Sequence, residues 1–169
     1  MTRICNAFRQ EGRSDRLPVV VFVNNDAYSA GAMICLSCDR IYMVPGGKIG
    51  AAMPWVEDPQ THLPAKLPDD VQEKFLSGMR AEVRSLAKTG GYAAGIAEAM
   101  VDRNIVLTEY EIDGKREVLT DKDYDNRKRE LGLADASLDE LNRRVKVVRV
   151  ICGKGELLTL DYQEARDVG

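Results

Sequence analysis

The 169-residue sequence has little of several features, and each scarcity excludes a class of protein. No apolar run approaches the ~18 consecutive residues of a membrane-spanning helix. The net charge is only −3, so composition gives no electrostatic reason to expect nucleic acid or an anionic membrane surface as a partner. Four cysteines in a chain of this length are too few for a disulfide scaffold.

What the sequence contains is typical of a single globular domain. Apolar residues make up 44% and charged residues 30%, which is ordinary for a soluble protein that buries a core. The order of its segments (strand, helix, strand, then helices) predicts an α/β fold with a parallel sheet. We therefore expect one domain over residues 1–169.

The most informative stretch is Val19–Ala52. Its continuous apolar run, Val19–Val23, is of the kind that a buried parallel strand needs, and polar turn residues follow it. Ser29 then stands among small residues at the start of a short apolar helix pattern. Such neighbours allow a sharp turn and an exposed hydroxyl, as in a G-x-S-x-G elbow, although Ala27 replaces the first glycine. Ser29 is therefore a candidate nucleophile, and a helix N-cap is the structural alternative.

Two other groups of candidate residues also have structural alternatives. Cys35 and Cys38 form a C-x-x-C, a spacing found in metal and redox sites, but no second pair completes such a site. Both fall in an apolar helix pattern, so we expect buried structural thiols. His62, the only histidine, lies in the proline-rich stretch Met53–Pro68. It is a candidate general base, and a solvated loop histidine is the alternative.

The clearest helix is Asp69–Lys88, where Asp69 and Gln72 resemble a capping box. Its expected apolar stripe consists of Val71, Phe75, Met79, Val83 and Leu86. The following residues predict a helix around Ile96–Val101, a hairpin turning at Asp113-Gly114, helices over Thr120–Leu131 and Ser137–Arg144, a strand over Val145–Ile151, and a last helix capped by Asp161 and Glu164.

Together these residues resemble a known family. Pro18–Pro54 is similar to the ClpP-class serine peptidases, specifically the membrane-associated NfeD-type and signal peptide peptidase A branch. Members share a strand ending near A-x-S-A-G, a strand reading roughly D-x-I-x-M-x-P and an I-G-A-A-x-P segment. Here these motifs are Ala27–Gly31, Asp39–Pro45 and Ile49–Pro54. The similarity is weakest over 109–145, which we expect to be an insertion with a hairpin and two short helices.

The resemblance implies a ClpP/crotonase-type α/β spiral that cleaves peptide bonds through an acyl-enzyme. The family's nucleophile corresponds to Ser29, its general base to Lys74, and part of its oxyanion hole to the backbone amide of Ala30. Lys74 borders the apolar stripe, so we expect its amine to be partly desolvated, as a lysine base requires. His62 is the alternative base. No cofactor and no metal is implied.

The same resemblance implies a homo-oligomer that acts on peptides or membrane-protein segments and is membrane-associated or periplasmic, although the sequence itself is that of a soluble protein. In the family, a second oxyanion donor comes from a strand before a helix similar to Thr2–Gln10. That strand is not in this sequence, so we expect weak or absent peptidase activity. Two alternatives stay open. Leu36–Ile41 also fits a crotonase-like acyl-CoA enzyme, and an inactive oligomeric scaffold would share the fold.

Overall fold

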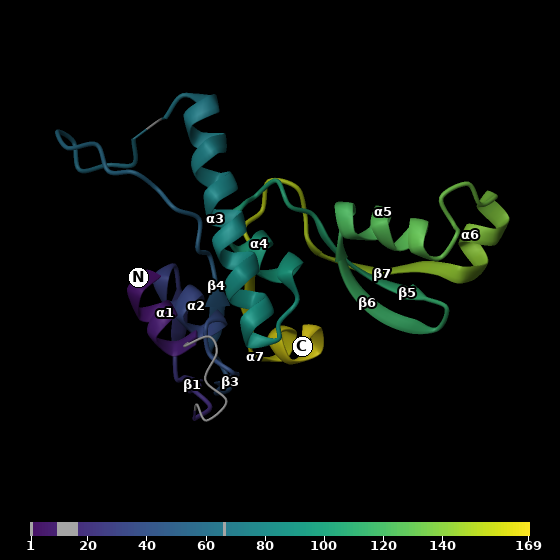
Figure 1. The fold of residues 1–169 in the computed structure, drawn as a ribbon, viewed down its shortest axis with the longest axis horizontal. Coiled ribbons are helices and arrows are strands. Elements are labelled where there is room, and N and C mark those ends of the chain that lie inside the picture. Colours follow the sequence, from purple (N-terminus) through teal and green to yellow (C-terminus); the bar gives the residue numbers. More distant parts are fainter. Residues whose placement is uncertain (1, 10–16, 66) are drawn as a thin grey trace.

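The structure is a computed structural model that describes residues 2–9, 17–65 and 67–169 (Figure 1). Helices and strands alternate through most of the chain, which confirms the predicted α/β class. In chain order the elements are α1 (Thr2–Arg9), β1 (Val20–Val23), β2 (Asp26–Tyr28), α2 (Ala30–Leu36), β3 (Arg40–Met43), β4 (Lys48–Gly50), α3 (Asp69–Gly90), α4 (Ala94–Val101), β5 (Leu107–Ile112), β6 (Lys115–Thr120), α5 (Asp121–Glu130), α6 (Leu138–Arg144), β7 (Val145–Cys152), β8 (Thr159–Asp161) and α7 (Tyr162–Val168).

The strands around Ser29 pair in parallel, as the sequence predicts. Strand β1 pairs with β3, and β2 pairs with β4. Strand β8 adds to the other edge of β4 in the antiparallel direction. The predicted parallel sheet is therefore present as two short parallel pairs, joined at one edge by a strand from the C-terminal part of the chain.

Strand β1 is not buried on both faces, so that prediction is wrong. Val23 is buried, but the Phe22 side chain is 72% exposed and stacks on Tyr42 of β3. The reason is that β1 and β3 form a sheet of their own, and only one of its faces packs on the core. An uninterrupted apolar run does not distinguish such a strand from one buried on both sides.

Helix α3 packs on the core only through its C-terminal half. Val83 and Leu86 are fully buried, whereas Phe75 is 44% exposed and Val71 is exposed to a similar extent. Figure 1 shows the first turns of α3 extending beyond the body of the protein, next to the loop that precedes it. The predicted apolar stripe is therefore buried only over its last part.

The predicted capping box of α3 is also wrong. Pro68 occupies the N-cap position, and its carbonyl accepts a hydrogen bond from the amide of Gln72. No side chain caps the helix. Asp69 is already helical, one position too late for its carboxylate to act as the N-cap acceptor.

Helices α2 and α4 supply much of the core, together with the C-terminal half of α3. The predicted helix around Ile96–Val101 is confirmed as α4, and six of its eight residues are buried. Both cysteines of the C-x-x-C are buried too, which confirms the prediction of interior thiols. None of the helices in the described residues is both long and apolar enough to cross a membrane.

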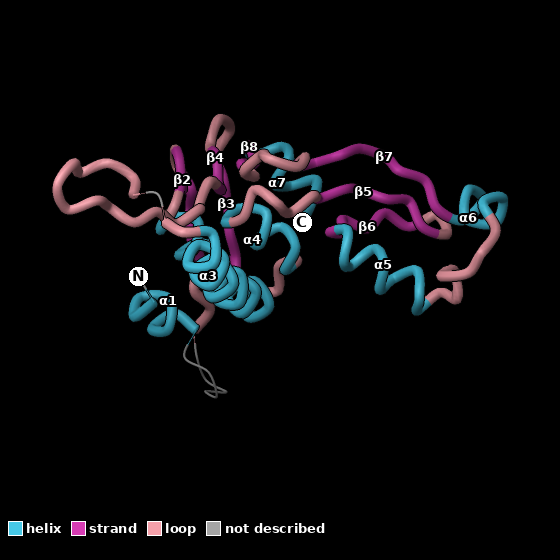
Figure 2. The backbone as a smooth tube through the Cα atoms, turned by 90° about the horizontal axis from the view of Figure 1, so that it is seen from above, coloured by secondary structure: helices cyan, strands magenta, loops and turns pink. Residues whose placement is uncertain are grey.

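Residues 107–152 form a lobe that extends away from the rest of the protein (Figures 1 and 2). Its antiparallel sheet has the order β6-β5-β7, and α5 lies along it. The predicted hairpin is confirmed: both turn residues have positive φ, 50° at Asp113 and 79° at Gly114, as a type I′ turn requires. Tyr124 of α5 stacks on Tyr110 of β5 with ring centroids 4.3 Å apart.

Candidate active site

Ser29 lies between β2 and α2, and its backbone has an unusual conformation. Its φ is 53° and its ψ is −122°, a region that is costly for any residue other than glycine. The Ser29 amide donates to the carbonyls of Gly50 and Ala51, each at 3.2 Å. These contacts from the end of β4 hold the turn in its strained geometry.

The Ser29 side chain does not cap α2. Ser29 occupies the N-cap position, but its hydroxyl accepts no hydrogen bond from the first turn of the helix. The residue is exposed, and no contact of its hydroxyl with another described residue is present. The structure therefore does not support the capping alternative.

Small residues let the backbone segments around Ser29 approach one another closely. Gly50 has φ 139°, and a Cβ added there would lie 2.3 Å from the carbonyl oxygen of Leu158. Only glycine fits at this position, and it keeps the end of β4 where its carbonyl meets Ser29. The I-G-A-A segment is part of the family motif, but the sequence alone did not predict a role for Gly50 or Ala51. A glycine followed by small residues directly after a strand was the available signal.

Ala30, whose amide is the expected oxyanion donor, is the first residue of α2. The amide is too early in the helix to have an intrahelical acceptor. No other described backbone carbonyl accepts from it, and the residue is exposed. The Ala30 amide thus directly follows the residue that carries the Ser29 hydroxyl, and it is available to donate a hydrogen bond to a ligand.

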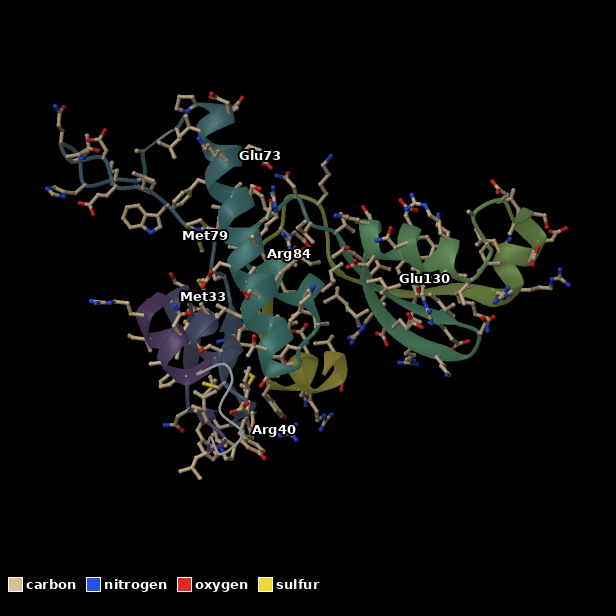
Figure 3. All side chains as sticks on the ribbon, viewed as in Figure 1. Met33, Arg40, Glu73, Met79, Arg84 and Glu130 are labelled. Carbon is tan, nitrogen blue, oxygen red and sulfur yellow. The ribbon has the colours of Figure 1, made fainter. Side chains whose placement is uncertain are left out.

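Lys74 does not contact Ser29. It lies in the second turn of α3, on the part that projects from the body, and among the described residues its amine makes neither a hydrogen bond nor an ion pair. In Figure 3 the preceding residue, Glu73, lies well apart from Met33, which is one turn along α2 from Ser29. The Lys74 side chain is exposed, unlike the expected partly desolvated amine. In these turns only Leu76 is buried, while Val71 and Phe75 are exposed on the remainder of the apolar face.

His62 lies in the projecting loop and pairs with a carboxylate there. Its Nδ1 is hydrogen-bonded to Oε1 of Glu57, and the side chain is 79% exposed. The loop has local structure, since Glu57 and Pro64 form an isolated antiparallel bridge and the Asp58 carboxylate accepts from two backbone amides. No contact between His62 and Ser29 is present among the described residues.

The buried cysteines are poorly suited to surface chemistry. Burial raises the pKa of the Cys35 thiol to about 11, and burial also raises the pKa of Cys38. The Cys38 thiol donates to the carbonyl of Ile34 at 3.3 Å. Within the described part of the chain, no group of three or more side chains of the kinds that bind metals comes together.

This chain is similar to one family model and to two curated proteins, both of which are named as membrane proteins or membrane-bound. The model of the NfeD1b N-terminal domain family matches residues 5–142. Membrane protein NfeD1b of Bacillus subtilis is 61% identical over 36 residues, 21% of this chain and 8% of that protein. Membrane-bound protease PH1510 of Pyrococcus horikoshii is 31% identical over 105 residues, 60% of this chain and 23% of that protein. The matched part of this chain thus spans less than a quarter of the length of either relative.

Two solved structures are also similar, both of mutants of the 1510-N membrane-bound stomatin-specific protease. One has a TM-score of 0.48 at 23% identity and covers 82% of this chain and 60% of that chain. The other, in complex with a substrate peptide, has a TM-score of 0.47 at 23% identity and covers 96% of this chain and 68% of that chain.

Proposed function

This chain belongs to the NfeD1b N-terminal domain family, and on that premise we propose that it is a ClpP-type serine peptidase domain with Ser29 as its nucleophile. The observation that carries the proposal is the Ser29 turn, a strained backbone with an exposed hydroxyl that has no structural task. Strain of this kind costs about 1–3 kcal/mol and is concentrated at functional sites. The name of PH1510, a membrane-bound protease, supports peptide bonds as the target.

The proposed reaction passes through an acyl-enzyme. The Ser29 oxygen attacks the carbonyl carbon of a peptide bond, while the neutral amine of Lys74 takes the hydroxyl proton. The amide of Ala30 donates to the negatively charged oxygen that forms. The carbon–nitrogen bond then breaks, and the leaving amine takes the proton from Lys74. Water releases the acyl group, with Lys74 again acting as the base.

This mechanism requires Lys74 to move to Ser29 and out of water. A lysine amine loses its proton near neutral pH only when its surroundings disfavour the charge, chiefly through burial. Next to Lys74, the projecting loop and first turns of α3 carry exposed apolar side chains: Trp55, Val56, Leu63, Val71 and Phe75. We infer that a substrate or a second copy of the chain covers this surface and assembles the dyad. The uncovered chain is then a weak peptidase.

Other exposed apolar surfaces support self-association. Phe22 and Tyr42 are exposed on the sheet of β1 and β3, and Val147 and Val150 are exposed on the edge strand β7. We propose that the protein is a homo-oligomer, acting on peptides or on accessible segments of membrane proteins. Sedimentation velocity over micromolar concentrations tests this directly, and a strict monomer at every concentration would contradict it.

The nucleophile is tested with a fluorophosphonate, which labels activated serines. We expect labelling at Ser29 that Ser29→Ala abolishes and that Ser77→Ala, a change at an exposed serine in α3, leaves intact. Labelling that persists in Ser29→Ala would refute the assignment. No labelling even at high protein concentration would instead favour the inactive scaffold. A crotonase-like acyl-CoA enzyme needs no serine nucleophile, and the free Ser29 hydroxyl gives that alternative no support.

A further inference from the structure

The outer edge of β7 is open. Strand β7 lies at one end of the sheet β6-β5-β7, so its other edge has no neighbouring strand among the described residues. Apart from its pairing with β5, no backbone hydrogen bond joins 145–152 to another described part of the chain. Figure 2 shows β7 along one border of the lobe, with α5 beside β6 at the other border. A strand of eight residues therefore presents outward-facing amides and carbonyls, which an added strand would satisfy.

An irregularity in the pairing of β7 with β5 places two exposed valines on the same face of the sheet. Val147 pairs with Tyr110 and Val150 pairs with Thr108, while Val148 has no direct partner. Tyr110 and Thr108 are two residues apart on β5, so they and their partners share one face. Helix α5 lies over β6 on this face and leaves β7 uncovered. The Val147 and Val150 side chains are therefore 64% and 60% exposed at the open edge.

The cations of β7 do not protect this edge. Exposed edge strands commonly carry charged side chains, especially lysine, that prevent pairing with another chain. Here Lys146 is paired with Glu111 at 3.2 Å, and Arg149 is paired with Glu109 at 2.7 Å. Both glutamates lie on β5, on the inner side of β7, so each cation is neutralised and held away from the outer edge. A second strand can then approach without meeting an uncompensated charge.

The strand that fits this edge is β7 of a second copy. A two-fold axis makes the same edge serve both partners, as in most homodimers. In an antiparallel pair with this axis between residues 148 and 149, Val147 of each copy lies opposite Val150 of the other. Lys146 lies opposite Ile151, and Arg149 lies opposite Val148. Apolar side chains thus meet in two places, and no like charges face each other.

The neighbouring registers of the same pair are less favourable. A shift of one residue in one direction places Arg149 opposite Arg149, and like charges directly opposite destabilise a strand pair. A shift in the other direction places Val147 opposite Arg149 and Val150 opposite Lys146, so the exposed valines meet charged side chains. The sequence of β7 is therefore complementary to itself in one register, a property that an unrelated peptide would not share.

We propose that two copies of the chain pair through their β7 strands, antiparallel about a two-fold axis, so that two three-stranded sheets become one continuous sheet. This contact rests on the homo-oligomer proposed above and identifies one of its interfaces. It does not involve Ser29. The first turns of α3 lie apart from the lobe in Figure 1, so this contact leaves them uncovered.

The test measures β7 directly. Hydrogen–deuterium exchange of the β7 amides is followed at low and high protein concentration, beside sedimentation velocity, for the wild type and three variants. Val147→Lys/Val150→Lys places like charges opposite each other across the pair, whereas Val147→Glu/Val150→Lys places opposite charges there. Leu138→Lys, at a 77% exposed side chain of α6 in the same lobe, is the matched control. Thermal melts confirm that each variant folds.

In the wild type we expect protection of the β7 amides to rise with protein concentration. Val147→Lys/Val150→Lys should weaken this association about tenfold or more, and Val147→Glu/Val150→Lys should return it to within about threefold of the wild type. Leu138→Lys should change it by less than about twofold.

Three results would overturn the proposal, and they differ in what they leave standing. If β7 exchange in the wild type is independent of concentration while sedimentation shows an oligomer, the homo-oligomer stands and another surface holds it. If Val147→Glu/Val150→Lys associates no better than Val147→Lys/Val150→Lys, the strands do not pair in this register. A strict monomer in sedimentation would refute both the β7 contact and the homo-oligomer, while labelling of Ser29 would still test the nucleophile.

Discussion

Because the backbone at Ser29 is strained, replacing Ser29 with glycine should raise the stability of the protein, whereas glycine substitutions usually lower it. A residue held in this backbone region stores about 1–3 kcal/mol of strain, which glycine does not have. Glycine also gives the unfolded chain more freedom, which lowers stability by about 0.4–1 kcal/mol. The hydroxyl makes no described hydrogen bond, so its removal costs nothing further. Ser29→Gly should therefore stabilise the protein by about 1 kcal/mol, which corresponds to a rise of ~2–4 °C in melting temperature at this size.

Two variants make this measurement specific. Ser29→Ala keeps the strained φ and should leave the melting temperature unchanged. Ser77→Gly, in the middle of α3, should lower stability by about 0.5 kcal/mol, because glycine is a poor helix former. Urea and thermal unfolding of the four proteins would give the comparison. If Ser29→Gly lowers stability as Ser77→Gly does, the turn is not strained and the structural basis for the nucleophile assignment fails.

Three further predictions concern the base, a buried thiol and a buried carboxylate. Lys74→Ala should reduce peptide turnover by ~10² or more without unfolding the protein, and an equal loss in His62→Ala alone would reassign the base. Burial raises the pKa of Cys35 from 9.0 in the unfolded chain to about 11 in the folded protein, so the unfolded state loses its thiol proton first as the pH rises. The free energy of unfolding should therefore fall between pH 9 and 11 by up to ~1.4 kcal/mol per pH unit. The slope should be shallower in Cys35→Ala. The double change of Arg116 and Arg149 to alanine should destabilise the protein by about 3 kcal/mol in urea unfolding, since it leaves the Glu109 carboxylate, only 6% exposed, without either partner. Lys146→Ala, which removes the partner of the 35% exposed Glu111 two residues along β5, should cost at most about 1 kcal/mol, and equal effects would contradict this distinction.

Features that depend on short-range chemistry could be predicted from the sequence. The Asp113-Gly114 turn needs only two residues that tolerate positive φ, and the structure has both. The cap of α7 needs Asp161 and Glu164 three residues apart, and both reciprocal hydrogen bonds are present. The position of Ser29 between a strand and a helix follows from the same kind of local pattern.

Features that depend on distant contacts could not be predicted. The apolar spacing of α3 is uniform along the helix, but only its second half meets α4 and α2, so Phe75 is exposed while Leu86 is buried. Glu109 is another case. A carboxylate on a strand is normally expected at the surface, yet Arg116 and Arg149 on the two neighbouring strands both pair with it.

The two residues of the proposed dyad, Ser29 and Lys74, also differ in how far their geometry depends on surrounding contacts. The geometry at Ser29 is held by its hydrogen bonds to Gly50 and Ala51, and Leu158 in turn holds Ala51 by accepting a hydrogen bond from its amide. The geometry at Lys74 depends on what packs against the first turns of α3, and no described residue packs there closely enough to bury it. Ser29 already has the geometry of a nucleophile, whereas Lys74 is not yet placed as a base. Peptidase activity would therefore depend on what covers the first turns of α3. Reactivity of Ser29 toward a fluorophosphonate should therefore rise with protein concentration, while the stability change in Ser29→Gly should not depend on it.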